Sequence, residues 1–89
     1  MESDKLDAIG AFGIFRCAAF SGIRNIPLYL DETDEGYKKS AVGHFEDKLF
    51  KLEHMMMTET GKIVARRRTE AMRDVLQYMK DEQELKDFP

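Results

Sequence analysis

The sequence is poor in residues that cross-link or rigidify small folds, with one cysteine, two prolines and no tryptophan. The single cysteine, Cys17, excludes an intramolecular disulfide and a zinc site made of cysteines, and it favours a reducing compartment. Residues 1–4 are acidic, whereas a signal peptide opens with basic and then apolar residues. The longest apolar run, residues 8–20, is too short to cross a bilayer and contains Arg16. We therefore expect a cytoplasmic protein without a membrane segment.

The sequence also lacks a strong excess of charge of either sign. Its net charge is −3, with 35% charged and 43% hydrophobic residues, which gives no general attraction for nucleic acid or anionic lipid. The arginine run at residues 66–68 forms no single patch on a helix, because successive side chains point about 100° apart. A chain of 89 residues makes at most one small domain. We expect no nucleic-acid partner and no membrane partner.

The apolar pattern predicts an all-α fold of about three helices with one long loop. The first helix covers about residues 4–20 and is apolar around its whole circumference. Such a helix needs burial on every side, and two further amphipathic helices in so short a chain cannot easily cover it. We therefore expect self-association, a complementing second chain, or a place within a larger helical domain.

The rest of the chain is expected to form the loop and two amphipathic helices. Residues 23–39 lack helical periodicity and carry an acidic run, as exposed loops do. The second helix starts after Ser40 as its N-cap and keeps three-and-four apolar spacing to Met56. The third helix starts after the N-cap Thr58 and runs to about Leu85.

Two acidic residues lie three positions apart in the first predicted helix. Asp4 and Asp7 project from one side of a helix, within reach of a common cation or water. The same pair is also the acidic first turn that a helix dipole favours, and spacing alone favours this second interpretation.

A basic row follows on the second predicted helix. His44, Lys48 and Lys51 lie at steps of four and three beside the apolar stripe. They either face phosphate oxygens or form a solvated basic edge. Both interpretations stay open for His44 and Lys48, and the solvated edge is favoured for Lys51.

Other polar and sulfur-containing residues favour structural roles. Arg68 interrupts the apolar stripe of the third helix, so it needs a carboxylate or carbonyl partner. An internal structural ion pair is the favoured interpretation, and a site residue is the alternative. His54 is expected to be an ordinary surface or half-buried histidine. The methionines at 55–57 are expected to fill the core rather than to bind a metal.

Four segments, in order along nearly the whole chain, resemble motifs of one branch of the HD-superfamily metal-dependent phosphohydrolases. Residues 2–11, ESDKLDAIGA, resemble its D-A-D-R-L-D-A-I-G-A signature. Residues 40–49 are similar to S-A-I-x-H-F-x-x-K-L, and residues 57–60 to N-T-E-T. Residues 65–72 resemble A-x-x-R-x-x-F-M, with Arg68 on the arginine. The resemblance implies that residues 1–89 form one partial domain, the C-terminal part of an HD-type helical fold whose upstream helices would cover the apolar helix.

The resemblance also implies a site that the chain carries only in part. The family binds a divalent metal, Mn, Co, Ni or Mg, through a histidine, an adjacent His-Asp pair and a distant aspartate. Only that aspartate maps here, onto Asp4, with Asp7 as its acidic neighbour, and the sequence contains no His-Asp dipeptide. His44 and Lys48 match positions expected to bind phosphate. Glu2, Lys5 and Gly61 depart from the family pattern, which leaves the ends of these elements less defined.

The functional expectation is therefore a fragment of a phosphohydrolase. Intact relatives are expected to hydrolyse phosphate esters or nucleotide phosphoanhydrides, whereas one carboxylate binds a cation weakly and fixes its geometry poorly. The isolated chain is thus expected to be inactive, and whether it acts as an enzyme is left open. The alternative is a small helical interaction module that dimerises or complements a second chain. A partner or adjacent segment carrying the missing histidine set would favour the enzyme.

Overall fold

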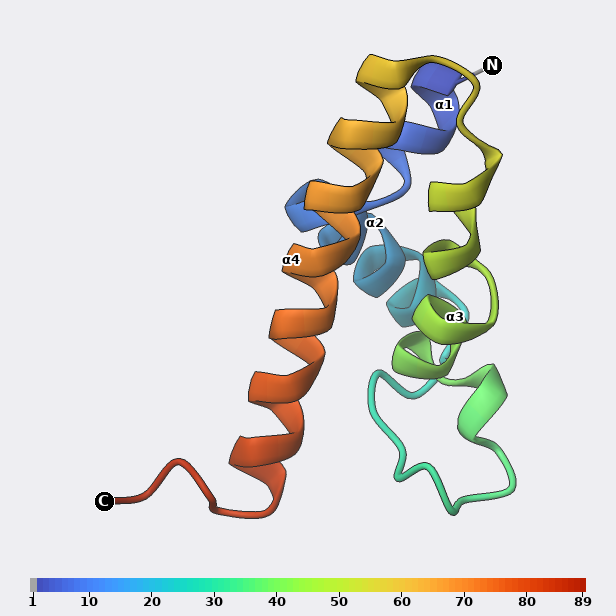
Figure 1. The fold of residues 1–89 in the computed structure, drawn as a ribbon. Helices are drawn as coiled ribbons and strands as arrows, with labels where there is room; N and C mark the ends of the chain where they lie inside the picture. The colour runs from blue at the N-terminus through green and yellow to red at the C-terminus, as the bar shows by residue number, and fades with distance from the viewer. Residues whose placement is uncertain (1) are drawn as a thin grey trace.

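The structure is a computed structural model that describes residues 2–89, and this part of the chain is helical without any β-strand (Figure 1). Its α-helices are α1 (Glu2–Asp7), α2 (Gly10–Ile23), α3 (Ala41–Asp47) and α4 (Glu59–Gln83). Two 3₁₀ helices, η1 (Tyr37–Lys39) and η2 (Leu49–Met55), flank α3. The expected all-α class is confirmed, and none of the helices described is long and apolar enough to cross a membrane.

The first predicted helix is broken in two, so its prediction as one continuous element is wrong. Gly10 has a φ of +84°, in the left-handed region that glycine adopts at little cost. Ile9 before it is extended and caps α2 without a side-chain hydrogen bond. The second part then continues past the expected end at Phe20 to Ile23. The break gives α1 and α2 separate directions.

The second predicted helix starts where expected and ends early. The Ser40 hydroxyl accepts a hydrogen bond from the amide of Gly43 at 3.1 Å, which confirms the N-cap. The helix ends at Asp47, and the chain continues as η2 rather than as one helix to Met56. A 3₁₀ helix has about three residues per turn, so the apolar spacing suits either form.

The first amides of α3 find partners in the loop before it. The amides of Ala41 and Val42 donate to the carbonyls of Pro27 and Leu28 at 2.9 and 3.1 Å. Together with the Ser40 cap, these bonds satisfy three of the four amides that a helix start leaves open. The loop is therefore fastened to the start of α3.

The third predicted helix is confirmed as α4, which ends at Gln83. The Thr58 hydroxyl accepts from the amide of Gly61 at 2.9 Å, as expected of its N-cap. The buried side of α4 is formed by Gly61, Ala65, Thr69, Met72 and Leu76. Lys80 near the end of α4 forms an ion pair with Glu32, which ties the acidic loop to this helix.

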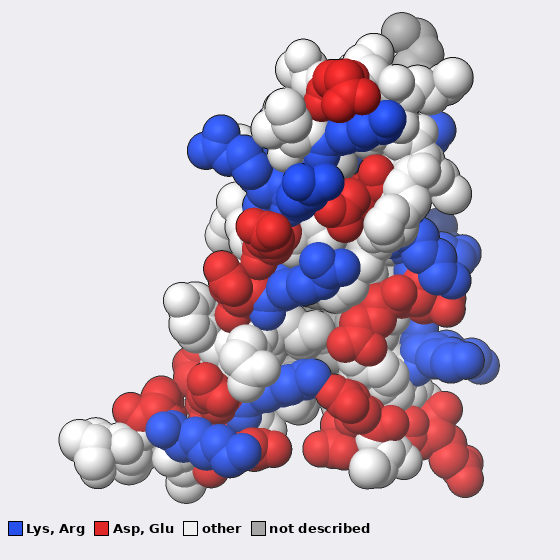
Figure 2. Space-filling model, viewed as in Figure 1, with Lys and Arg blue, Asp and Glu red and all other residues white. Residues whose placement is uncertain are grey.

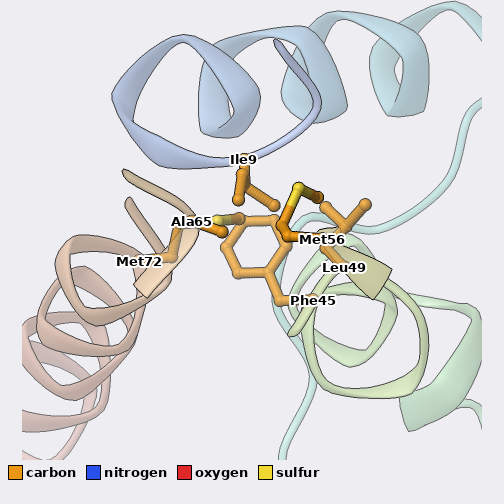
Figure 3. Close-up of a cluster of buried hydrophobic side chains, with 6 residues drawn as sticks. All are labelled: Ile9, Phe45, Leu49, Met56, Ala65 and Met72. Atoms are coloured by element: carbon orange, nitrogen blue, oxygen red, sulfur yellow. The ribbon is translucent and has the colours of Figure 1, made fainter. Parts of the chain in front are cut away.

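The core is small and lies where four elements meet (Figure 3). Ile9 points into it from the break between α1 and α2, opposite side chains of α3, η2 and α4. The other members are Phe45, Leu49, Met56, Ala65 and Met72. Of the three consecutive methionines, Met56 is buried, whereas its two neighbours are exposed. The expected core filling therefore holds for Met56 alone.

Helix α2 remains largely uncovered, as its apolar circumference led us to expect. The side chains of Phe12, Phe15 and Ile23 are 82%, 73% and 82% exposed. Positions 12, 15 and 23 share one side of an α-helix. Together they form an exposed apolar face, which we call the α2 face.

We predict that Gly43→Ala destabilises the chain strongly. A Cβ atom at this position would overlap the carbonyl group of Tyr37, which is backbone and cannot move without displacing η1. The free energy of unfolding, measured by urea denaturation, should fall by about 1–3 kcal/mol. Gly22→Ala is the control, because its Cβ would meet no atom within 4 Å and should stabilise α2 by up to about 1 kcal/mol. Unchanged stability of Gly43→Ala would contradict this packing of η1 on α3.

Candidate functional site

A hollow of about 550 Å³ lies between α1, α2, η1 and α3. Part of its wall is apolar, from Ala8, Phe20, Ile26, Ala41 and Leu49. Its titratable lining residues are Asp4, Arg16, Cys17, Lys39, His44 and Lys48. We call this hollow the central pocket.

The central pocket collects three of the residues that the sequence predicted for the site. Asp4 comes from α1, His44 from α3, and Lys48 from the residue that ends α3. The Lys48 amide donates to the His44 carbonyl at 3.0 Å, which keeps both residues on the last turn of this short helix. Residues far apart in the sequence thus line one pocket.

The pocket favours an anion. Arg16, Lys39 and Lys48 contribute three cationic side chains, against the single carboxylate of Asp4. Phosphate oxygens bind most strongly to such charged donors, and arginine can engage two of them at once. The apolar wall beside the cations offers room for the less polar part of a phosphate ester.

Arg16, Lys39 and Cys17 were not predicted as site residues. The sequence showed Arg16 only as a charge inside an apolar run, and Lys39 only as the residue before the N-cap of α3. The position of Arg16 within an apolar helix was the one sequence feature that could have indicated a site residue. An arginine on an otherwise apolar helix is expected where its charged end reaches water or an anion.

Burial raises the pKa of the Cys17 thiol, and a hydrogen bond with Ser21 opposes this shift only in part. The thiol also lies 4.0 Å from the Ala41 carbonyl. At neutral pH the sulfur is therefore protonated, and the nucleophilic thiolate is scarce. Cys17 belongs to the wall of the pocket and does not have the environment of a reactive cysteine.

The remaining predicted residues lie elsewhere. Asp7 lines another hollow, of about 440 Å³, together with Arg16 and Arg68. The two aspartates of α1 therefore line different hollows. Lys51 and His54 are exposed and outside the central pocket. Asp7 and Lys51 are therefore not among the residues that line the central pocket.

Arg68 is exposed, so its expected internal position is wrong. Its Nη1 atom donates a hydrogen bond to the Leu6 carbonyl at 2.9 Å. The partner is thus a carbonyl, and not the carboxylate of the ion pair that the sequence favoured. Arg68 therefore has the carbonyl partner that was the alternative expectation, and the hydrogen bond joins the surface of α4 to α1.

The described residues do not build a metal site by themselves. Within residues 2–89, no group of three or more histidine, cysteine, aspartate and glutamate side chains could hold a metal ion. Asp4 and His44 line one pocket, but a stable site for a divalent cation needs more protein ligands than these.

One face of the molecule carries charges of both signs (Figure 2). On the face shown in Figure 2, basic and acidic side chains lie interspersed over α4 and the loop beside it. Such a face offers no continuous basic track for a nucleic-acid backbone.

No protein-family model matches the chain. Solved structures do match it. An HD-superfamily hydrolase of Bacillus thuringiensis is 32% identical with a TM-score of 0.83, over 93% of this chain and 43% of that one. A Lactobacillus plantarum protein is 34% identical with a TM-score of 0.82, over 94% of this chain and 44% of that one.

A third relative is YpgQ of Bacillus subtilis. It is 40% identical over 88 residues, which make up 99% of this chain and 38% of YpgQ. Its structure in complex with ADP matches with a TM-score of 0.72 and 42% identity, over 99% of this chain and 42% of that one. The chain thus has the all-α fold of part of an HD-superfamily hydrolase, and it spans less than half the length of these relatives.

We predict that Cys17 reacts slowly with iodoacetamide. Because its pKa is raised above the ordinary thiol value of 9.0, less thiolate is present at any given pH below that range. The alkylation rate, followed by mass spectrometry from pH 7 to 10, should reach half-maximum at higher pH than for a free cysteine peptide. In urea the two rates should become equal. A midpoint at or below that of the free peptide would contradict the burial of this thiol.

Proposed function

We propose that the chain carries the aspartate and the phosphate-binding part of an HD-type phosphohydrolase site, and corresponds to the C-terminal part of such a domain. The observation that supports this most is the central pocket, which brings Asp4, His44 and Lys48 together. These are the residues that the HD resemblance assigns to metal and phosphate. The substrate class is a nucleotide or another phosphate ester.

The pocket's chemistry supports a nucleoside diphosphate as its ligand. The cationic side chains of Lys48 and Arg16 can donate hydrogen bonds to phosphate oxygens. Phe20 and Leu49 offer apolar surface for a base or sugar. The similarity to YpgQ, whose structure was solved with ADP, supports the same ligand class. We therefore propose ADP as the first ligand to test.

Binding without turnover is the expected behaviour of this chain alone. A divalent metal supplies an activated water and neutralises phosphate charge in this type of hydrolysis. Among the described residues, no group of three or more potential ligand side chains could hold that metal. We propose that the remaining histidine ligands come from another segment or a second chain, and that Asp4 joins them there.

We predict that the chain binds ADP in the presence of EDTA and releases no phosphate. Calorimetric titration should show an affinity that falls as salt rises, because the contacts are ionic. Lys48→Met should weaken binding roughly tenfold or more, the effect of losing one charged hydrogen bond. Lys51→Met is the matched control, since this lysine is exposed and outside the pocket, and it should change little.

The hydrolysis assay adds manganese, cobalt, nickel or magnesium and follows phosphate release. No turnover is expected from the chain alone, and turnover should appear when a polypeptide carrying the missing histidine set is added. Robust turnover by the chain alone that disappears in Asp4→Ala would contradict the proposal. It would point to a site completed between two copies, with histidines from the second copy.

The α2 face supports a second candidate function, a helical interaction module. Phe12, Phe15 and Ile23 together expose an apolar surface of a kind that marks protein interfaces. The partner is either a second copy or the complementing polypeptide. This candidate does not compete with nucleotide binding, because the central pocket is lined by other residues of α2.

We predict that the chain associates at micromolar concentration through the α2 face. Sedimentation velocity should show a dimer or larger species, and Phe15→Ser should shift the population toward monomer. The control is Tyr78→Ser, which removes an exposed aromatic ring from the C-terminal half of α4 and should leave the association unchanged. A monomer that fails to bind a hydrophobic dye would rule out this function.

A further inference from the structure

Helix α1 is short and depends on the rest of the chain for its direction. It has six residues, too few to be stable alone, and its last carbonyls lack partners within the helix. Leu6 packs against the core, but such apolar contacts have little directional preference. A hydrogen bond from outside the helix is therefore the contact best suited to fix its orientation.

Arg68 supplies this bond from α4. Its Nη1 atom donates to the Leu6 carbonyl at 2.9 Å, joining residues 62 positions apart in the sequence. The same carbonyl accepts from the Ile9 amide only at 3.4 Å, so the arginine is the closer donor. The bond lies at the C-terminal end of α1, where unpaired carbonyls favour a cation.

The side chain of Arg68 also lies across the link between α1 and α2. A Cβ atom at Gly10 would come within 3.0, 3.1 and 3.2 Å of the Cγ, Cβ and Cδ atoms of Arg68. The arginine therefore packs directly on the glycine whose positive φ breaks the helix. At Gly13, a Cβ would overlap the Ala8 carbonyl, so the link is closely packed there as well.

We infer that Arg68 is a positioning residue, which holds α1 so that Asp4 lies at the central pocket. Asp4 lies two residues before Leu6 on the same short helix, so the direction of α1 decides whether its carboxylate lies at the pocket that His44 and Lys48 line. The inference rests on the proposed function in one respect, because ADP binding is used to detect where the Asp4 charge lies. Arg68 belongs to the fourth HD-like segment, residues 65–72, and does not itself line the central pocket. Its role there is therefore indirect, through the orientation of α1.

A double-mutant cycle tests this in EDTA with ADP as the probe. Asp4→Asn should tighten ADP binding about two- to fivefold, because it removes a partly screened negative charge beside the diphosphate. Arg68→Met keeps the length of the stem and removes the donor, so in this background Asp4→Asn should change the affinity hardly at all. Arg68→Lys, which retains a donor, should restore part of the effect.

Arg67→Met is the matched control, because it removes a neighbouring exposed cation of α4 and should keep the full Asp4→Asn effect. A loss of overall stability alone would not abolish this coupling in folded protein. An Asp4→Asn effect of equal size in the wild-type and Arg68→Met backgrounds would overturn the inference.

Amide hydrogen exchange gives a second result that does not depend on ligand binding. The amides of Ala8 and Ile9, bonded to the carbonyls of Lys5 and Leu6, should exchange faster in Arg68→Met. Amides in the middle of α4 should keep their protection. Unchanged exchange at Ala8 and Ile9 overturns the inference whatever the ADP data show. If the wild-type chain binds no ADP, the proposed function fails, and exchange alone decides whether Arg68 holds α1.

Discussion

The break between α1 and α2 is the constraint on which the rest of the structure depends. Gly10 takes a positive φ, and Ile9 before it turns into the core, where it is 2% exposed. On one continuous helix, Asp4 and Arg16 would lie about 18 Å apart along the axis, too far to line a single small pocket. Both residues line the central pocket, so the same break that completes the core also shapes this pocket.

Local signals in the sequence predicted the parts of the fold that are determined locally. Ser40 and Thr58 cap their helices through their own hydroxyl groups, and both N-caps were identified correctly. The break at Gly10 was missed because its cause is tertiary, in the burial of Ile9 and the packing of Arg68. The change from α3 to η2 was missed because both helix types satisfy the same apolar spacing.

Motif resemblance named some of the residues that line the candidate site, but not its full lining. Asp4, His44 and Lys48 were named and lie in one pocket, although their chemical roles remain predictions. Arg16 and Lys39 were missed, since no periodicity or motif shows that α2 and η1 meet at this pocket. Asp7 was named as the acidic neighbour of Asp4; it lines a different hollow, and its role stays a prediction.

Helix α2 links the two candidate functions physically. Arg16 and Cys17 line the central pocket, while Phe12 and Phe15 of the same helix are exposed, and Phe20 both lines the pocket and is half exposed. A small core leaves a thin margin of stability, so whatever covers the α2 face stabilises the folded chain and with it the pocket wall. By reciprocity, a ligand that orders the pocket wall should strengthen attachment of a partner to the α2 face. Nucleotide binding and complementation are therefore expected to be coupled through this one helix.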